Sequence, residues 1–203
     1  MSTVIMHNVV SVDGFIADAK DQVGPLFDWY VNGDVEIIDG GQIKVSQASA
    51  DYIKTTWAGI GSMVIGRHLF DTTNGWEGVP PAGDHVVVVS HRPRPDDWEP
   101  EGFHPVHPRE RQASYYFISD VAHAIATAKE LAGERTVAVA AGDVGGQAFA
   151  LGLVDEVAMD VVPVVFGSGK RYFGSVDAQH LLEDPHTVIQ GNRVLHLRYR
   201  VRR

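Results

Sequence analysis

Short apolar runs rich in valine and isoleucine recur along the chain and predict the strands of a sheet. Most of these runs are apolar at consecutive positions, which is typical of strands that are covered on both faces. The run at 194–201 instead alternates apolar and polar residues, which predicts a strand with one solvated face. The consecutive runs lie at 3–10, 62–66, 85–90, 136–140 and 156–167.

Three segments with a helical pattern lie between these runs, at 45–59, 119–133 and 143–152. In the second segment, Ser119 or Asp120 can cap the first turn. Its apolar face is formed by Val121, Ile125, Ala128 and Leu131. The alternation of strands and helices predicts an α/β fold with a mixed, mainly parallel sheet flanked by helices. The last strands have no helix between them and are expected to pair antiparallel.

A polar stretch rich in proline and histidine, at 92–112, interrupts both periodicities and is expected to form a surface loop or insertion. There is no internal repeat and no obvious linker, so residues 1–203 are interpreted as a single domain. The prolines within and after the segment from His104 to His107 exclude the helical geometry of a hydrolytic zinc site. We therefore expect no metal site.

The composition is that of a globular protein with an acidic balance: 44% of the residues are hydrophobic, 21% are charged, and the formal net charge is −9. A nucleic-acid groove needs a basic stripe, and none appears, so no nucleic-acid partner is expected. The absence of cysteine removes disulfides, thiolate zinc sites and cysteine nucleophiles. Neither a signal-peptide pattern nor a membrane-spanning apolar run occurs, which favours a cytoplasmic protein without a membrane partner.

The step from the strand at 136–140 into the following helix consists of small residues, Ala140, Ala141 and Gly142, followed by Asp143 and Val144. Unpaired N–H groups at a helix start can bind an anion. However, the step matches neither the dinucleotide-binding G-x-G-x-x-G pattern nor a Walker A loop. On its own, it is better explained as a tight strand–helix turn with Asp143 as the N-cap.

Two further strand ends carry basic residues. Gly66 and Arg67 follow one strand, and an arginine at a helix start is unfavourable unless an anion lies nearby. Pairing of Arg67 with Asp71 explains the same pattern equally well. Ser90 and Arg92, on either side of His91, follow the next strand, where open α/β sheets bind ligands and where these side chains can hold a phosphate. A solvated basic turn is the plainer interpretation of this motif.

The segment at 8–34 combines a turn pair, Asp13-Gly14, with aromatic residues in a turn-rich context. The aromatic residues Phe15 and Trp29 look exposed and can form the walls of a pocket for a flat ligand. Asp13, Asp28 or Asp34 can supply a carboxylate, although each such residue is more often a cap or turn residue.

Four stretches in one order, "SVDGFIAD", "VIGRHLFD", "VVVVSHRP" and "AAGDVGGQAFALGLVDEVAMDVVPVVFGSGKRYF", resemble the dihydrofolate reductase-like family. The chain is most similar to the reductase domain of bacterial riboflavin-biosynthesis deaminase-reductases in a stand-alone form. The resemblance covers about residues 4–173, and its most specific part is the last stretch. It implies a single three-layer α/β domain, NADPH as cofactor, hydride transfer to a heterocyclic or pentose-derived substrate, and a homodimer.

The resemblance also implies roles for individual residues. It places Asp13 and Gly14 in the loop beside the nicotinamide and the substrate. A carboxylate or a water is expected to supply the proton, and our candidates for the polar group are Asp13 and Asp28. Our candidates for substrate contact are Gly14, Phe15 and Trp29. The candidate cofactor-binding residues are Gly66, Arg67, His68, Ser90, His91, Arg92, Ala140, Ala141, Gly142, Asp143 and Val144. Relatives usually carry two glycines in place of Ala140 and Ala141, and this departure motivates an alternative, a nucleotide- or flavin-binding module without turnover.

Overall fold

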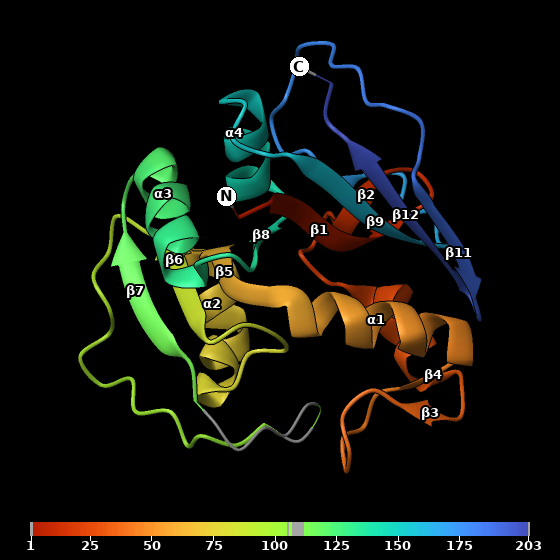
Figure 1. Cartoon of the computed structure of the whole chain (residues 1–203), viewed down its shortest axis with the longest axis horizontal. Coiled ribbons are helices and arrows are strands. Elements are labelled where there is room, and N and C mark those ends of the chain that lie inside the picture. The colour runs from red at the N-terminus through yellow and green to blue at the C-terminus, as the bar shows by residue number, and fades with distance from the viewer. Residues whose placement is uncertain (1, 105, 107–111, 203) are drawn as a thin grey trace.

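Eight strands form one sheet at the centre of the computed structural model, which describes residues 2–104, 106 and 112–202 (Figure 1). The strand order is β11-β12-β9-β1-β8-β5-β6-β7. The six strands from β9 to β7 are parallel to their neighbours, whereas β12 pairs antiparallel with both β9 and β11. The strands are β1 (Val4–Ser11), β5 (Ile60–Gly66), β6 (His85–Val89), β7 (Ser114–Ile118), β8 (Thr136–Ala140), β9 (Glu156–Val162), β11 (Thr187–Gly191) and β12 (Val194–Arg200).

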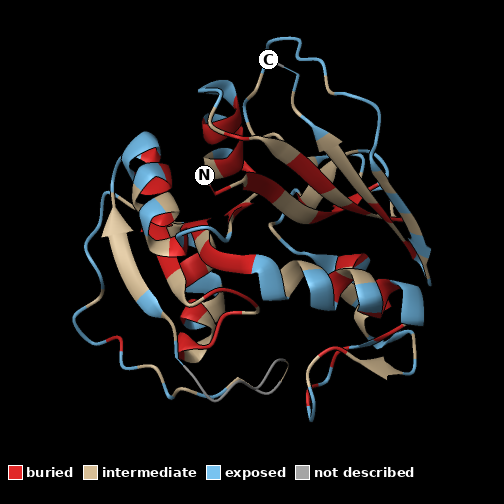
Figure 2. Ribbon diagram, in the orientation of Figure 1, coloured by how far each residue is buried: buried red, intermediate tan, exposed pale blue. Residues whose placement is uncertain are grey.

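Helices cover both faces of the sheet, which gives the expected three-layer α/β domain (Figures 1 and 2). Side chains alternate along β1, so that Val4 and Met6 pack beneath α3 and α4, while Val9 packs beneath α1. A smaller cluster around Phe70 joins α2 to the same face as α1. The helices are α1 (Gln47–Gly59), α2 (Arg67–Thr73), α3 (Val121–Ala132), α4 (Asp143–Ala150) and the 3-10 segments η1 (Gly24–Val31) and η2 (Asn74–Gly78).

The helical predictions are confirmed within two or three residues, but one predicted cap is wrong. Asp120 caps α3 by accepting a hydrogen bond from the N–H of His123, one of the two options the sequence left open. Helix α4 starts at Asp143, as expected, but its N-cap is Gly142. Gly142 has φ +93° and ψ −146°, a conformation open almost only to glycine, so the chain turns one residue earlier than predicted.

The sequence pattern missed several strands at the edges of the molecule. β7 and β11 are the two outer strands of the main sheet. β11 alternates half-buried and exposed residues, whereas the aromatic and β-branched residues 115–118 of β7 were an available strand signal. Two short ladders were also unforeseen because each strand has only two to four residues. They are β2 (Phe15–Asp18) with β10 (Gly169–Arg171), and β3 (Val35–Glu36) with β4 (Lys44–Val45).

The predicted surface loop joins β6 to β7, and its residues 105 and 107–111, His107 included, lie outside the described residues. Its described part is mostly exposed but is anchored by Trp98, which is 7% exposed. The ring of Trp98 packs edge-on against Phe70, and its Nε1 donates to the carbonyl of Asn74 at 3.1 Å. In the described part of the chain, none of the helices is long and apolar enough to cross a membrane.

Candidate active site

The carboxyl ends of β1, β5, β6 and β8 lie along one edge of the sheet because these strands are parallel. Ligands of open α/β sheets bind at this edge. The three predicted cofactor-binding segments follow β8, β5 and β6, which are neighbours in the sheet. The structure therefore brings these three segments together along adjacent strands.

The starts of helices α4 and α2 lie against each other at this edge. A Cβ placed on Gly66, the residue before α2, would lie only 3.2 Å from Cγ2 of Val144 in the first turn of α4. Helix α4 has no side-chain cap, so N–H groups of its first turn remain available to an anion. Asp143 in that turn is exposed, and its negative charge stabilises the helix by interacting with the positive end of the helix dipole.

Ala140 and Ala141 occupy regular positions, and neither has a positive φ. Ala140 ends β8 and packs partly buried against the Phe70 cluster. Ala141 is 8% exposed, and its side chain belongs to the core beneath α3 and α4. The special backbone conformation belongs to Gly142, so the tight turn requires glycine at that position and not at Ala140 or Ala141.

Two arginines from different elements meet on one carboxylate at the start of α2. Arg67 Nε lies 2.6 Å from Asp71 Oδ1, and Arg92 Nη2 lies 2.8 Å from Asp71 Oδ2. Arg67 also donates to the carbonyl of Pro93 at 2.9 Å. Burial raises the pKa of the Asp71 carboxyl, but the hydrogen bonds and charges of Arg67 and Arg92 outweigh this and hold its pKa below the ordinary value. The pairing of Arg67 with Asp71, one of the two interpretations from sequence, is thus observed.

The strand end after β6 forms a compact polar turn. Ser90 Oγ donates to the carbonyl of Arg92 at 2.7 Å and accepts from the N–H of Arg92 at 3.0 Å. The side chain of Arg92 is 66% exposed, and His91 is also exposed. His68, by contrast, is engaged: its Nε2 lies 2.6 Å from Asp21 Oδ2, in the turn that follows β2. This contact brings the turn after β2 to the start of α2.

Asp13, an exposed residue, ties two loops together. Its carboxylate accepts hydrogen bonds from Ser11 Oγ at 2.6 Å, from the N–H of Gly167 at 2.7 Å and from the N–H of Phe166 at 3.2 Å. The bond from Ser11 lowers the pKa of Asp13 most; burial raises it, and the two backbone bonds lower it further, so that the pKa lies below its ordinary value. An ionised acceptor with these partners is suited to holding the loop, not to donating a proton.

The remaining predicted residues divide between turn, surface and core. Gly14, with φ +89°, makes the turn after β1, and Phe15 opens β2 beside it. Asp28 is exposed on η1. The interpretation of Trp29 as an exposed aromatic residue is wrong, because it is 2% exposed and packs in the core beneath α1. Every third residue of a 3-10 segment lies on the same side, so Trp29 faces the core together with Leu26, three positions before it.

A buried polar network that the sequence patterns did not indicate crosses the sheet beneath α1. Asp160 of β9 lies 2.9 Å from His7 Nε2 and 2.6 Å from His196 Nδ1, and His196 Nε2 lies 2.9 Å from Ser49 Oγ. Burial raises the pKa of Asp160, but the charge of His7 and the hydrogen bonds of both imidazoles outweigh this and hold the pKa well below its ordinary range. Two features of the sequence could have indicated this network: Asp160 lies inside the apolar run at 156–167, and His196 lies in the last strand.

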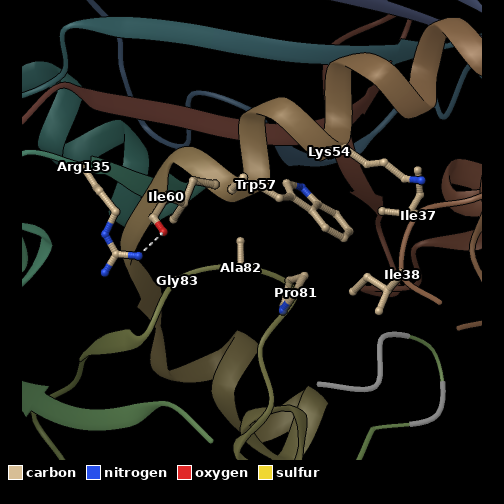
Figure 3. A pocket seen from close by; sticks show the side chains of 10 residues that line it. Ile37, Ile38, Lys54, Trp57, Ile60, Pro81, Ala82, Gly83 and Arg135 are labelled. Carbon is tan, nitrogen blue, oxygen red and sulfur yellow. Dashed lines mark hydrogen bonds between the residues drawn. The ribbon is translucent and has the colours of Figure 1, made fainter. Parts of the chain in front are cut away.

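Two hollows open on the α1 face of the sheet. One, of about 160 Å³, is lined by His7 and Arg198, by Trp57 of α1, and by apolar residues of the strands. The other, of about 280 Å³, lies between α1, the segment 37–38 and the segment 81–83, beside Ile60 at the amino end of β5 (Figure 3). Arg135 also lines this hollow, and its Nη2 lies 2.6 Å from Oδ2 of Asp84. This second hollow is therefore distant from the strand ends that carry the predicted cofactor residues.

The residues at the strand ends fit a phosphate-bearing nucleotide. The start of α4 has no side-chain cap, and Arg67 and Arg92 together carry one positive charge more than Asp71, the carboxylate that they share, so both features suit an anion. Within residues 2–104, 106 and 112–202, no group of three or more histidine, aspartate or glutamate side chains could hold a metal ion.

Comparison with known proteins agrees with this architecture. The family model described as the RibD C-terminal domain matches residues 2–196. A candidate riboflavin biosynthesis protein from Shewanella sp. PV-4 superposes with a TM-score of 0.68 at 16% identity, covering 100% of both chains. RibD from Acinetobacter baumannii gives a TM-score of 0.62 at 16% identity, covering 100% of this chain and 58% of that one.

A third similar structure is the diaminohydroxyphosphoribosylaminopyrimidine deaminase/5-amino-6-(5-phosphoribosylamino)uracil reductase of Thermotoga maritima. Its TM-score is 0.62 at 12% identity, and the match covers 99% of this chain and 57% of that one. The present chain thus spans little more than half the length of these two-part relatives. No curated protein sequence matches the chain. At these identities, the structural likeness shows the shared fold.

Proposed function

Because the chain belongs to the family of RibD C-terminal domains, we propose that it is an NADPH-dependent reductase of a small heterocyclic or pentose-derived substrate. The Thermotoga relative is a 5-amino-6-(5-phosphoribosylamino)uracil reductase, so an aminouracil-type compound of riboflavin biosynthesis is the first substrate to test. The resemblance further suggests a homodimer, which light scattering of the purified chain can test.

The observation that carries this proposal is the pairing of Arg67 and Arg92 on Asp71, next to the Ser90 turn. Two guanidinium groups held within hydrogen-bond distance of one carboxylate present charge at one place on the sheet edge. Arg92, which is 66% exposed, can turn toward an anion while Arg67 remains anchored to Pro93. A ribose 2′-phosphate, the group that distinguishes NADPH from NADH, is an anion suited to such a pair.

The cofactor would be held by three segments of this chain. The start of α4 would receive the pyrophosphate, Gly66 and Arg67 would flank it, and Ser90 with Arg92 would bind the ribose phosphate. When bound, a reduced nicotinamide supplies a hydride to an electrophilic carbon. The chain itself orients both molecules and excludes water.

A second candidate function is a nucleotide- or flavin-binding module without turnover on the same fold. The observation that favours it is the state of Asp13, which is bound by Ser11, Phe166 and Gly167 and is not placed to donate a proton. Asp28, the other candidate carboxylate, is exposed on η1. Binding of NADPH without its oxidation by any aminouracil, pterin or quinone substrate supports this second function.

NADPH binding, followed by tryptophan fluorescence, tests the proposed function. Wild-type protein should bind NADPH more tightly than NADH, and Arg92→Ala should weaken NADPH binding by about tenfold, the effect of losing one charged hydrogen bond. Arg202→Ala, at an exposed position near the end of the chain, is the matched control and should leave binding unchanged. Equal and weak binding of both cofactors by the wild-type protein would end this proposal.

A further inference from the structure

The last two strands of the main sheet, β11 and β12, have one uncovered side. Of the described helices, only α1 packs extensively on these strands, and its Ser49 Oγ lies 2.9 Å from His196 Nε2 of β12. On the opposite side of the sheet, α3 and α4 pack on β1 and on the strands from β8 to β7. Figure 1 shows both of these helices to the left of β11 and β12, toward the other end of the sheet. The side of β11 and β12 opposite α1 therefore has no helical layer over it.

The residues on this uncovered side carry no charge. Leu197 of β12 is in register with Met159 of β9 and with Val188 of β11, so these three share one side of the sheet. Leu195 and Tyr199, two positions before and after Leu197, lie on that side too. Val188 is 59% exposed, and none of the apolar core clusters of the described chain includes Leu195, Leu197 or Tyr199. We call this set of residues the open face: Val188, Gln190, Leu195, Leu197 and Tyr199.

The polar residues of the same strands lie on the covered side instead. His196, which is 0% exposed, is bound to Asp160 beneath α1, and Arg198 is bound to Glu156 at the smaller hollow. The alternation at 194–201 does give this strand one solvated side, as predicted, but that side is the apolar one. Antiparallel sheets normally turn their polar side to water and bury the apolar side against another layer. The open face is thus built like an interior surface, which indicates that another layer covers it.

The chemistry of the open face favours a second copy of this chain as that layer. Each copy has a formal net charge of −9, so contact between two copies is favoured at a surface without charge. A twisted, pleated sheet face packs well against another sheet of the same twist, with the strands within about 30° of each other. Two identical faces meet these conditions about a two-fold axis, where an interface has to be complementary to itself.

The charges at the two ends of β12 complement each other about such an axis. The turn between β11 and β12 carries an exposed cation, Arg193. At the other end, the exposed residues Glu183 and Asp184 lie beside the strand, since the N–H of Glu183 donates to the carbonyl of Arg200 at 2.9 Å. Arg200 belongs to the α1 side by its register, and Arg202 is the other cation at this end. A two-fold axis through the middle of β12 brings Arg193 of each copy to the two carboxylates of the other copy.

We propose that the open face is the interface of a homodimer, in which it packs on the same face of a second copy about a two-fold axis. This inference rests on the homodimer suggested with the proposed function, and not on the reductase activity itself. Burial of the apolar side chains drives the association, and the end charges orient the two β12 strands antiparallel. The carboxyl ends of β5, β6 and β8 stay accessible to a cofactor, because β9 and β1 separate β8 from β12 in the sheet.

Light scattering of the full chain over a concentration series tests the interface. We expect wild-type protein to be a dimer, and Val188→Lys to raise the Kd of the dimer by about a hundredfold or more, because like charges then meet in an apolar contact. Val188 is largely exposed on an outer strand, so a lysine there should leave the fold intact, which circular dichroism checks. Ala126→Lys, at an exposed position of α3, adds the same charge elsewhere and should stay dimeric.

Thiol cross-linking provides the second measurement, since the chain has no cysteine of its own. Packed sheets lie about 10 Å apart, so a bifunctional maleimide of similar length should join two copies of Leu197→Cys and none of Ala126→Cys. A cross-link that fails in Leu197→Cys overturns the face-to-face arrangement, and so does a dimer that Val188→Lys leaves intact.

A monomeric wild-type protein overturns the proposal outright. If that monomer cosediments with phosphatidylcholine vesicles, the open face is a membrane contact instead of a dimer interface. NADPH binding is measured separately on the same samples, so the two conclusions can fail independently. A monomer that binds NADPH leaves the reductase function standing, whereas a dimer without NADPH binding ends the reductase function and leaves the interface standing.

Discussion

The N–H of Gly142 donates a hydrogen bond of 2.7 Å to the carbonyl of Tyr172. The N–H of Tyr172 in turn donates to the carbonyl of Gly14 at 2.9 Å. These two bonds join the start of α4 to the turn after β1, so that the proposed cofactor and substrate sides of the strand edge are held by one continuous backbone connection.

Replacement of Gly142 should disturb both sides at once. In Gly142→Ala, the added Cβ lies 3.0 Å from Ile16 Cδ1 and forces a side chain into a conformation with φ +93°. We expect a loss of about 1–3 kcal/mol in the free energy of unfolding, the usual cost of such backbone strain, together with weaker NADPH binding. Urea unfolding and fluorescence titration measure the two effects.

Gly59→Ala is the matched control for that variant. Gly59 ends α1 without a positive φ, and a Cβ added there would contact nothing within 4 Å. Stability and NADPH binding should be unchanged or slightly improved, since alanine favours a helix. Equal behaviour of the two alanine variants would contradict the role of the Gly142 turn.

Removal of the buried carboxylate should be strongly destabilising. In Asp160→Asn, the imidazoles of His7 and His196 lose the charge that both of them contact. Loss of hydrogen bonds to a charged group costs about 1.5–3 kcal/mol each, which urea unfolding resolves readily. Asp51→Asn, an exposed change on α1 where the native carboxylate accepts from Gln47, should stay within about 0.5 kcal/mol of wild type.

The lowered pKa of Asp160 predicts how the free energy of unfolding changes at acid pH. The folded pKa of Asp160 lies below its unfolded value of about 3.9, so its contribution is fully present above that pH and is lost as the pH falls through the folded pKa. Thermal unfolding between pH 7 and pH 3 should therefore show a falling Tm at the acid end. Asp160→Asn should have a shallower acid slope, and an identical slope would contradict this assignment.

Asp13 should control loop order rather than proton transfer. In Asp13→Ala, the N–H groups of Phe166 and Gly167 lose their acceptor. Hydrogen exchange of these two amides should become faster, while the dependence of kcat on pH keeps its shape. A changed pH profile with unchanged exchange would instead favour the catalytic role first expected for this residue.

The central strands and the helices beside them could be predicted from the sequence, because the residue patterns that form them are local. Consecutive apolar residues mark β1, β5, β6, β8 and β9, and small residues mark the start of α4. Edge strands such as β7 carry partly buried side chains, and their pairing is set by neighbours that are distant in the sequence.

The candidate site was predictable only in part, for a similar reason. Motifs at strand ends could be located because parallel strands place their ends together. The link from His7 to Asp160, in contrast, spans 153 positions, and no local pattern announces it. The burial of Trp29 likewise depends on tertiary packing against residues such as His196.

Hydrogen exchange of the full chain with and without NADPH tests the central claim most directly. We expect NADPH to slow exchange at 66–68, 90–92 and 141–144, the three segments at the carboxyl ends of β5, β6 and β8. The segment 81–83, which lines the hollow in Figure 3, should not change. Protection confined to that hollow, or no protection anywhere at saturating NADPH, would contradict the account.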